Sequence, residues 1–242
     1  MPRFLLSSLQ EGWGELTGEE ARHVARVHRY RIGDTIEVVG GNKVFRGYIE
    51  ELRDASIIIR LVAELPTSEP QLEITLYQGL VKGDKLELII QKAVELGVTR
   101  IAPVVCNRSV VALDDKKARD RTLRWQRIAQ EASKQSGRAK VPVVAQPLPL
   151  STAVAQDKSE LRLMAYEGGG IALKTCFSQA PVVHTVSCLI GPEGGFEHAE
   201  VDLAKAHGFI VVGLGPRILR AETAPLALLS ILMYELGDIG GL

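Results

Sequence analysis

From residue 72 onward, the sequence alternates short apolar runs with longer amphipathic segments. The runs at 72–78, 100–106, 161–166, 186–190 and 209–213 are typical of strands buried on both faces. The amphipathic segments at 84–97, 120–136, 197–208 and 224–237 have helical spacing. This alternation predicts an α/β domain whose mostly parallel sheet is covered by helices on both faces.

The first part of the chain has a different pattern. Short runs at 34–41, 43–52 and 55–65 are apolar or alternating and are separated by turn residues, which predicts a small β-rich module. One helix is expected after Thr17, with Glu20 completing a capping box. The linker PTSEP, 66–70, predicts a boundary between domains at 1–67 and 71–242.

Composition excludes several classes of protein. The apolar fraction is 46%, and no run is long enough to span a bilayer. The first residues, MPRFLLSSLQEGW, have too short an apolar core for a secretory signal. Three widely spaced cysteines and five histidines show neither a disulfide framework nor a metal-ligand spacing. We therefore expect a cytoplasmic protein with buried, reduced cysteines and no metal.

Basic residues are concentrated in two regions of a chain whose net charge is zero. From Arg100 to Lys140 there are eleven Lys and Arg against four Asp and Glu, and RHVARVHRYR at 22–31 has no acid. Arg22 and Arg26 fall away from the apolar stripe of their helix. Each region alone is equally compatible with a solvated helix face, but together they favour a nucleic acid partner.

Three of the predicted strands are followed by unusual corners: YEGGG at 166–170, GPEGG at 191–195 and LGPRILR at 214–220. Ligands of open α/β sheets bind at the carboxyl ends of the strands. Glycine lets the backbone come close to a flat ligand, so these corners predict a binding site. Neither a dinucleotide fingerprint nor a phosphate-binding P-loop is present. By elimination, an adenine-bearing ligand without a phosphate chain, such as S-adenosylmethionine, fits best.

Several motifs together resemble the RsmE family, which comprises ribosomal RNA uridine-N3 methyltransferases of the SPOUT superfamily. The motifs are LIGPEGGF at 189–196, LGPRILRAETA at 214–224, IIQKAVELGV at 89–98, NRS at 107–109 and EASKQSGR at 131–138. The resemblance implies an N-terminal PUA-like β-barrel, a C-terminal trefoil-knotted α/β domain, a homodimer and bound S-adenosylmethionine. It also implies 16S ribosomal RNA of the small subunit as the substrate, methylated at a uridine of the decoding region.

The resemblance also implies which residues hold the cofactor. Backbone groups of the glycine-rich corners are expected to contact the adenine and ribose, and Ile218 and Leu219 to cover the rings. Glu193 either meets a ribose hydroxyl or caps the following helix. The full expected set is Ala165, Tyr166, Glu167, Leu189, Gly191, Glu193, Gly194, Gly195, Leu214, Gly215, Ile218, Leu219, Arg220 and Ala224.

Catalysis requires stabilisation of the negative charge that spreads over the uracil ring as N3 loses its proton. A guanidinium beside the ring oxygens stabilises such charge, and Arg220 is expected in this role because it follows the cofactor loop. The alternative is a purely structural ion pair between Arg220 and Glu222. The sequence assigns no proton acceptor; Glu222, with a raised pKa, and a water molecule are the candidates.

RNA contacts are expected at Arg108, Gln135 and Arg138, which match family positions that grip the target nucleotide, and at Arg22 and Arg26. Three rival functions fit the same residues. One is methylation of a ribose 2′-oxygen, and another is methylation of transfer RNA. The third is RNA binding without catalysis, in which the glycine-rich corners are only tight turns.

Overall fold

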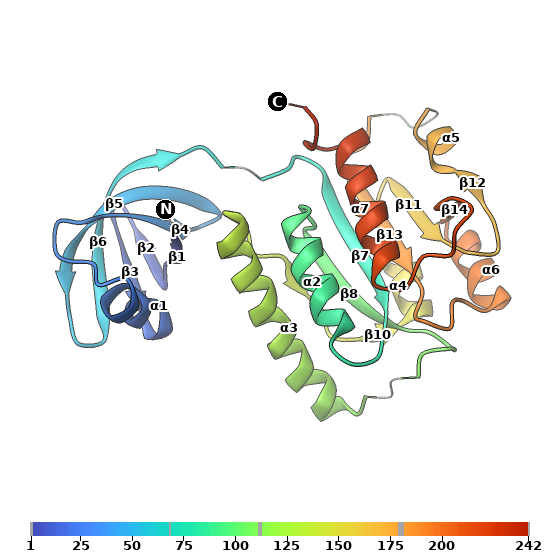
Figure 1. Cartoon of the computed structure of the whole chain (residues 1–242), viewed down its shortest axis with the longest axis horizontal. Coiled ribbons are helices and arrows are strands. Elements are labelled where there is room, and N and C mark those ends of the chain that lie inside the picture. Colours follow the sequence, from blue (N-terminus) through green and yellow to red (C-terminus); the bar gives the residue numbers. More distant parts are fainter. Residues whose placement is uncertain (1, 68, 111–112, 179–181, 242) are drawn as a thin grey trace. The chain divides into compact units, whose positions relative to one another are not determined.

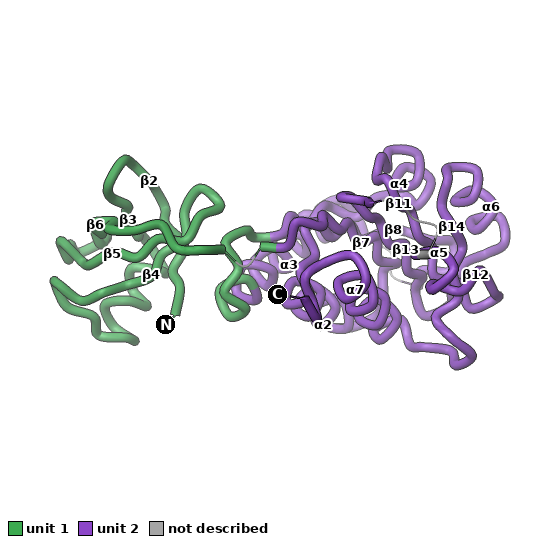
Figure 2. The backbone as a smooth tube through the Cα atoms, turned by 90° about the horizontal axis from the view of Figure 1, so that it is seen from above, with its two compact units in different colours: residues 1–69, 133–141 green, residues 70–132, 142–242 purple. Residues whose placement is uncertain are grey.

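The computed structural model describes residues 2–67, 69–110, 113–178 and 182–241. These residues form two compact units, shown in different colours in Figure 2. The first unit contains residues 1–69 and 133–141, and the second contains residues 70–132 and 142–242. The first unit is therefore discontinuous in sequence, because it includes the C-terminal end of a helix that begins in the second.

The first unit is built on a six-stranded sheet in the order β1-β4-β5-β6-β3-β2, in which only β1 and β4 are parallel. The sheet curls, because the short segment between β1 and β2 hydrogen-bonds to β4 near one edge and to β3 near the other. The Leu6 N–H donates to Val39 O (2.8 Å) and the Ser7 N–H to Glu15 O (2.8 Å). The strands are β1 Arg3–Leu5, β2 Ser8–Gln10, β3 Trp13–Thr17, β4 Thr35–Gly40, β5 Lys43–Leu52 and β6 Ser56–Leu65.

The helix of this unit starts at Gly18, as α1 (Gly18–Arg22), and continues as one π-helical turn (His23–Val27). The predicted capping box is wrong. The Thr17 hydroxyl lies 2.7 Å from the Ser7 hydroxyl, and Glu20 pairs with Lys134 instead of the helix N-terminus. Both partners are distant in sequence, so a local motif could not indicate them.

The second unit contains an eight-stranded, wholly parallel sheet (Figure 1). Its order is β10-β8-β7-β13-β11-β14-β12, with β9 beside β8. The strands are β7 Glu73–Gly79, β8 Arg100–Val105, β9 Val143–Val144, β10 Leu148–Pro149, β11 Leu161–Ala165, β12 Ile171–Ala172, β13 Thr185–Ile190 and β14 Ile210–Gly213. The five strands predicted from the sequence are confirmed, whereas β9, β10 and β12 are too short to give a hydrophobic pattern.

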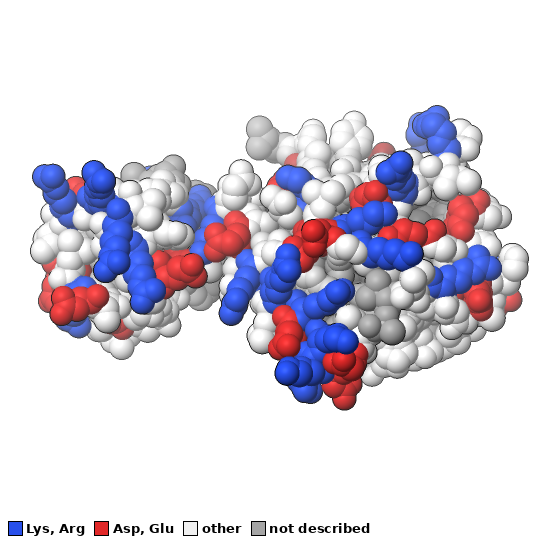
Figure 3. Space-filling model, turned by 60° about the horizontal axis from the view of Figure 1, so that its bottom comes forward, with Lys and Arg blue, Asp and Glu red and all other residues white. Residues whose placement is uncertain are grey.

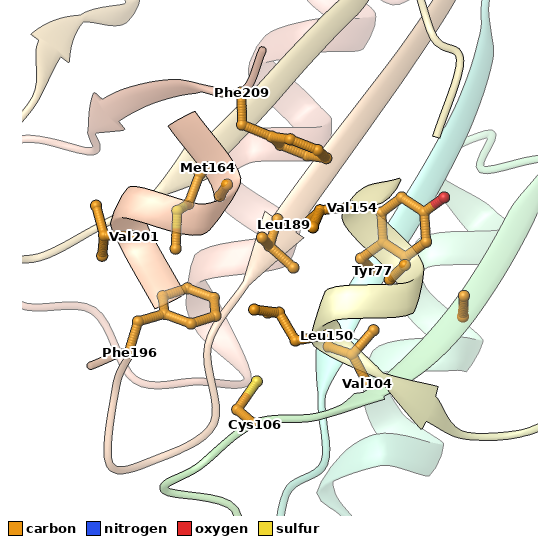
Figure 4. Packing of buried hydrophobic residues seen from close by; sticks show 13 residues of the cluster. Tyr77, Val104, Cys106, Leu150, Val154, Met164, Leu189, Phe196, Val201 and Phe209 are labelled. Carbon is orange, nitrogen blue, oxygen red and sulfur yellow. The ribbon is translucent and has the colours of Figure 1, made fainter. Parts of the chain in front are cut away.

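Helices cover both faces of this sheet, as predicted. They are α2 Lys85–Glu95, α3 Asp115–Ser136, α4 Leu150–Gln156, α5 Leu173–Ser178, α6 His198–Ala206 and α7 Thr223–Glu235. Leu189 packs in a cluster with residues of α4 and α6 (Figure 4). Because side chains alternate along a strand, the fully buried Cys188 faces the other side of the sheet. No helix in the described part of the chain is long and apolar enough to cross a membrane.

Two details of the helices differ from the prediction. Asp84 makes no side-chain hydrogen bond to the start of α2, although Gly97, with φ of 91°, does end that helix. The basic helix α3 starts at Asp115 rather than residue 120, because the Asp114 carboxylate accepts the Lys117 N–H (2.8 Å) and caps it. All three cysteines are buried and free, as predicted.

Candidate active site

The three glycine-rich corners meet at one edge of the parallel sheet. They follow β11, β13 and β14, and β11 lies between the other two strands. Parallel strands end at the same edge, so the corners lie side by side and enclose a cavity of about 580 Å³. This volume is within the range of small-molecule sites. The site predicted from the corners therefore exists as a cavity.

Nearly all residues expected to hold the cofactor line this cavity, and so do Arg220 and Glu222. Leu189 is the exception: it is fully buried in the hydrophobic cluster beneath the corner (Figure 4). It supports the wall without reaching the cavity. Gly169, Pro192, Pro216 and Arg217 also line the cavity and belong to the predicted corners, whereas the lining residues outside those corners that were not expected are Lys85, Ile190, Gly213 and Ala221.

Backbone shape explains the glycines at two points of the wall. Gly195 and Gly215 have φ values of 67° and 106°, which residues with a side chain rarely adopt. A Cβ at Gly195 would also clash with Glu167 Oε1. At these two positions the wall presents main chain rather than side chains to the cavity, which suits a flat ligand recognised through N–H and C=O groups.

A lysine at the start of α2 links two acidic residues of the cavity. Lys85 Nζ lies 3.3 Å from Glu193 Oε1 and 3.3 Å from Glu222 Oε2. Glu193 also accepts the Lys82 N–H (3.0 Å). It does not cap the following helix; a capping box of Glu197 and Glu200 does. The alternative in which Glu193 is a helix cap is therefore wrong.

The predicted raised pKa of Glu222 is also wrong. A hydrogen bond from its own backbone N–H and the neighbouring Lys85 ammonium hold the pKa of the Glu222 carboxyl below its ordinary value. Glu222 is therefore ionised at neutral pH and is a weak base. Its distance to Arg220 Nη1 is 3.9 Å, and the Arg220 side chain is 85% exposed. The structural ion pair between Arg220 and Glu222 is accordingly loose, which leaves Arg220 able to contact a substrate.

The loop after β8 contains Arg108, which is expected to bind RNA and which contacts a corner of the cavity. Arg108 Nη1 donates to Gly194 O (3.2 Å), and Arg108 Nε lies 3.9 Å from Glu197 Oε1. Half of the Arg108 side chain is exposed. Arg108, expected from the family motif to bind RNA, therefore contacts the backbone of the corner after β13 and still has solvent-facing surface.

The other four residues expected to bind RNA lie in the first unit. Arg22, Arg26 and Gln135 are exposed. Arg138 is not: its side chain is 5% exposed, and its guanidinium bonds Glu69 Oε2 at 2.9 Å. This buried ion pair fixes residues 133–141 within the first unit.

The cavity has neither a metal-ligand cluster nor a histidine base in its lining. Within the described residues, no three His, Cys, Asp or Glu side chains are arranged to hold a metal ion. Ile218, expected to cover the cofactor rings, is 84% exposed at the cavity. The site combines a cavity, the long cationic side chains of Lys85, Arg217 and Arg220, and the ionised carboxylates of Glu193 and Glu222.

Known proteins share this fold and sequence over nearly the whole chain. The RNA methyltransferase domain family matches residues 67–233. Ribosomal RNA small subunit methyltransferase E of Bacillus subtilis is 39% identical over 230 residues, which cover 91% of this chain and 89% of that protein. The Synechocystis protein of the same name is 34% identical and covers 89% of this chain and 71% of its own length.

Solved structures agree. A ribosomal RNA small subunit methyltransferase E from Neisseria gonorrhoeae, bound to S-adenosyl methionine, matches with a TM-score of 0.88 and 33% identity over 99% of both chains. Identity at this level over full length, together with the domain match, is sufficient to assign the family. This chain belongs to the ribosomal RNA small subunit methyltransferase E family.

Proposed function

We propose that this protein transfers a methyl group from S-adenosylmethionine to N3 of a uridine in the decoding region of 16S ribosomal RNA. Membership of the family makes the chain an S-adenosylmethionine-dependent ribosomal RNA methyltransferase. The observation that carries the proposal is the cavity of about 580 Å³ formed by three main-chain corners. A cavity of this size is large enough for an adenosine, and the sequence has no P-loop for a phosphate chain.

The residues of the three corners fit this cofactor. Main-chain groups of Gly191, Gly195 and Gly215 would hold the adenine and ribose, and Glu167 lies next to Gly195 in the same wall. When bound, S-adenosylmethionine supplies an already activated methyl group. The protein therefore contributes mainly by positioning the target nitrogen in line and keeping it there.

Arg220 is the residue that we propose for charge stabilisation. Loss of the N3 proton leaves negative charge on the two flanking uracil oxygens, and a guanidinium can donate to such oxygens. The Arg220 side chain lines the cavity and is free enough to turn towards a substrate. Glu222 is too acidic to take the proton efficiently, so we propose that water accepts it.

For the RNA, we propose contacts from Arg108, Gln135, Arg22 and Arg26, while the guanidinium of Arg138 has a structural role beside Glu69. Arginine side chains pair with phosphates, and a glutamine amide can pair with the edge of an unstacked uracil. The curled first unit corresponds to the PUA-like barrel in this proposal. The proposal also includes a trefoil knot in the second unit, a homodimer and a cytoplasmic location. Ile231 and Tyr234 on α7 are exposed apolar residues, which supports contact of α7 with a second subunit.

Incubation with isotope-labelled S-adenosylmethionine and undermethylated small ribosomal subunits tests the proposal. Mass spectrometry of the digested RNA should find one labelled base, a uridine methylated at N3. Label on a ribose or on transfer RNA would select one of the rival methyltransferase activities. Failure to bind the cofactor in isothermal titration would support RNA binding without catalysis.

A further inference from the structure

The solvent face of α3 carries a row of basic side chains that the active site does not use. Trp125 and Ala129 are buried and define the inner face of this helix. At 100° per residue, Lys116 and Arg127 lie on the opposite face and Arg119 lies at its edge, and all three are exposed. We call these three residues the α3 basic face.

Ion pairs do not neutralise this row. Lys116, Arg119 and Arg127 have no ion-pair partner among the described residues. Neighbouring cations on the helix are paired instead: Lys117 with Asp114 (3.2 Å) and Arg124 with Glu87 (2.8 Å). On the same helix, Asp120, Asp115 and Glu131 stand four residues from Lys116, Arg119 and Arg127, respectively. Figure 3 shows Lys and Arg side chains, with some Asp and Glu side chains among them, over this part of the second unit.

Topology places the beginning of this row at the edge of the sheet where the cavity lies. β8 ends at Val105, α3 begins at Asp115, and β9 then pairs in parallel with the first residues of β8. The helix must therefore start near the carboxyl edge of the sheet and return to the other edge. The connection contains Arg108, which contacts the corner at Gly194.

We propose that the α3 basic face binds the phosphates of the ribosomal RNA that flank the methylated nucleotide. From Lys116 to Arg127 the helix rises about 17 Å, enough to contact several phosphates. The inference rests on the proposed function, because it takes RNA as the substrate.

A polyanion fits this face better than a protein does. Unpaired cations in a chain with zero net charge indicate electrostatic attraction to phosphates. Leu123, 63% exposed, is the apolar residue between them. One isolated leucine is ordinary for a protein surface and is no docking patch.

Removal of the three charges gives the first test. The variant Lys116→Gln/Arg119→Gln/Arg127→Gln is compared with Lys43→Gln/Arg53→Gln/Lys205→Gln, which removes three exposed cations that are paired with acids elsewhere. Affinity for small subunits is measured at several salt concentrations. The slope of log K against log salt should become shallower by about two in the α3 variant, since each phosphate contact contributes about 0.7 to 0.9.

The control variant should keep the wild-type slope, and both variants should bind S-adenosylmethionine as the wild type does. An unchanged slope in the α3 variant overturns the inference. Wild-type protein that binds subunits but transfers no methyl group overturns the proposed function and not this inference, because the slope is independent of turnover.

Crosslinking identifies the partner directly. A photoactivatable reagent on Arg119→Cys labels one site selectively, because the three native cysteines are buried. Irradiation with small subunits should crosslink it to 16S ribosomal RNA. A crosslink to a ribosomal protein, or no crosslink, contradicts the inference.

Discussion

Lys85 Nζ lies 3.3 Å from Glu222 Oε2, so a side chain at the start of α2 holds the residue that precedes α7. The same ammonium lies 3.3 Å from Glu193, in the corner after β13. Three segments separated by up to 137 residues thus share one cation at the cavity wall. The Lys85 ammonium lowers the pKa values of Glu193 and Glu222 and so favours their ionised forms.

Removal of that cation should loosen the wall. Lys85→Met is expected to weaken S-adenosylmethionine binding about threefold to fivefold, the size expected of a partly exposed ion pair. Lys85→Arg should restore most of the affinity, because a guanidinium can reach both carboxylates. Isothermal titration measures both variants, and full affinity in Lys85→Met would show that the pairing has no role in the site.

Glu222 should not change its protonation state near neutral pH, and the pH dependence of turnover should therefore not come from this residue. Its pKa is lowered, so its pairing with Lys85 is complete above the ordinary glutamate pKa of about 4.3 and is lost only as the pH falls through the lower folded value. The turnover rate of Glu222→Gln should therefore depend on pH as the wild-type rate does from about pH 6 to about pH 9. A neutral-pH limb that disappears in Glu222→Gln would identify Glu222 as the proton acceptor.

Arg220→Ala should reduce turnover by about a hundredfold or more, because it removes a donor to charge that develops in the transition state. Cofactor affinity should stay nearly constant, since the Arg220 side chain is 85% exposed and its contact with Glu222 is loose. Single-turnover rates and isothermal titration separate the two effects. Loss of cofactor binding would instead give Arg220 a structural role.

Substitution of Gly195 should damage the site more than the same change at Gly213. Gly195→Ala places a Cβ at positive φ, which costs about 1 kcal/mol, and displaces Glu167. Gly213 also lines the cavity, but its φ is ordinary and no atom lies within 4 Å of an added Cβ. Cofactor affinities of the two variants give the comparison, and equal losses would argue against a backbone cause.

The buried pair of Glu69 and Arg138 should stabilise the first unit. Burial alone raises the pKa of Glu69, but hydrogen bonds from Arg138 and from the Lys140 and Ala139 N–H groups outweigh it and lower the pKa. Its stabilising effect is therefore present above about pH 4.3 and is lost as the pH falls through the lower folded pKa.

Removal of one member, as in Arg138→Met, leaves a buried charge and should cost about 3 kcal/mol. The melting temperature of the wild type should decrease at pH values below about 4, and in Glu69→Gln it should depend less on pH. An Arg138→Met protein that melts like the wild type but fails to bind RNA would return Arg138 to the RNA surface.

Local pattern was sufficient to predict the longer strands and the three corners, because an apolar or alternating run and a high glycine content can be recognised in a short stretch of sequence. The absence of phosphate-binding motifs favoured S-adenosylmethionine, and motif resemblance added the substrate class. Lys85 was missed because its contact with Glu193 depends on β7 lying beside β13, and strand order is not visible in a window. Leu189 was assigned to the cavity because a motif marks position along the chain and not the direction of a side chain.

Glu20 and Arg138 show the same limit. Their partners, Lys134 and Glu69, are 114 and 69 residues away, so neither the failed capping box nor the buried ion pair had a local signal. The burial of Arg138 argues against an RNA role, but this burial follows from packing within the first unit and is not visible in the sequence.

The insertion of residues 133–141 into the first unit has a consequence for synthesis. Ala139 packs with Val39 and Val44, and the Arg3 guanidinium bonds Gly137 O. An emerging N-terminal portion therefore exposes part of its own interior until residue 141 has left the ribosome. The nascent chain must begin its second, wholly parallel sheet before its first module can close, so the two halves mature together rather than in succession.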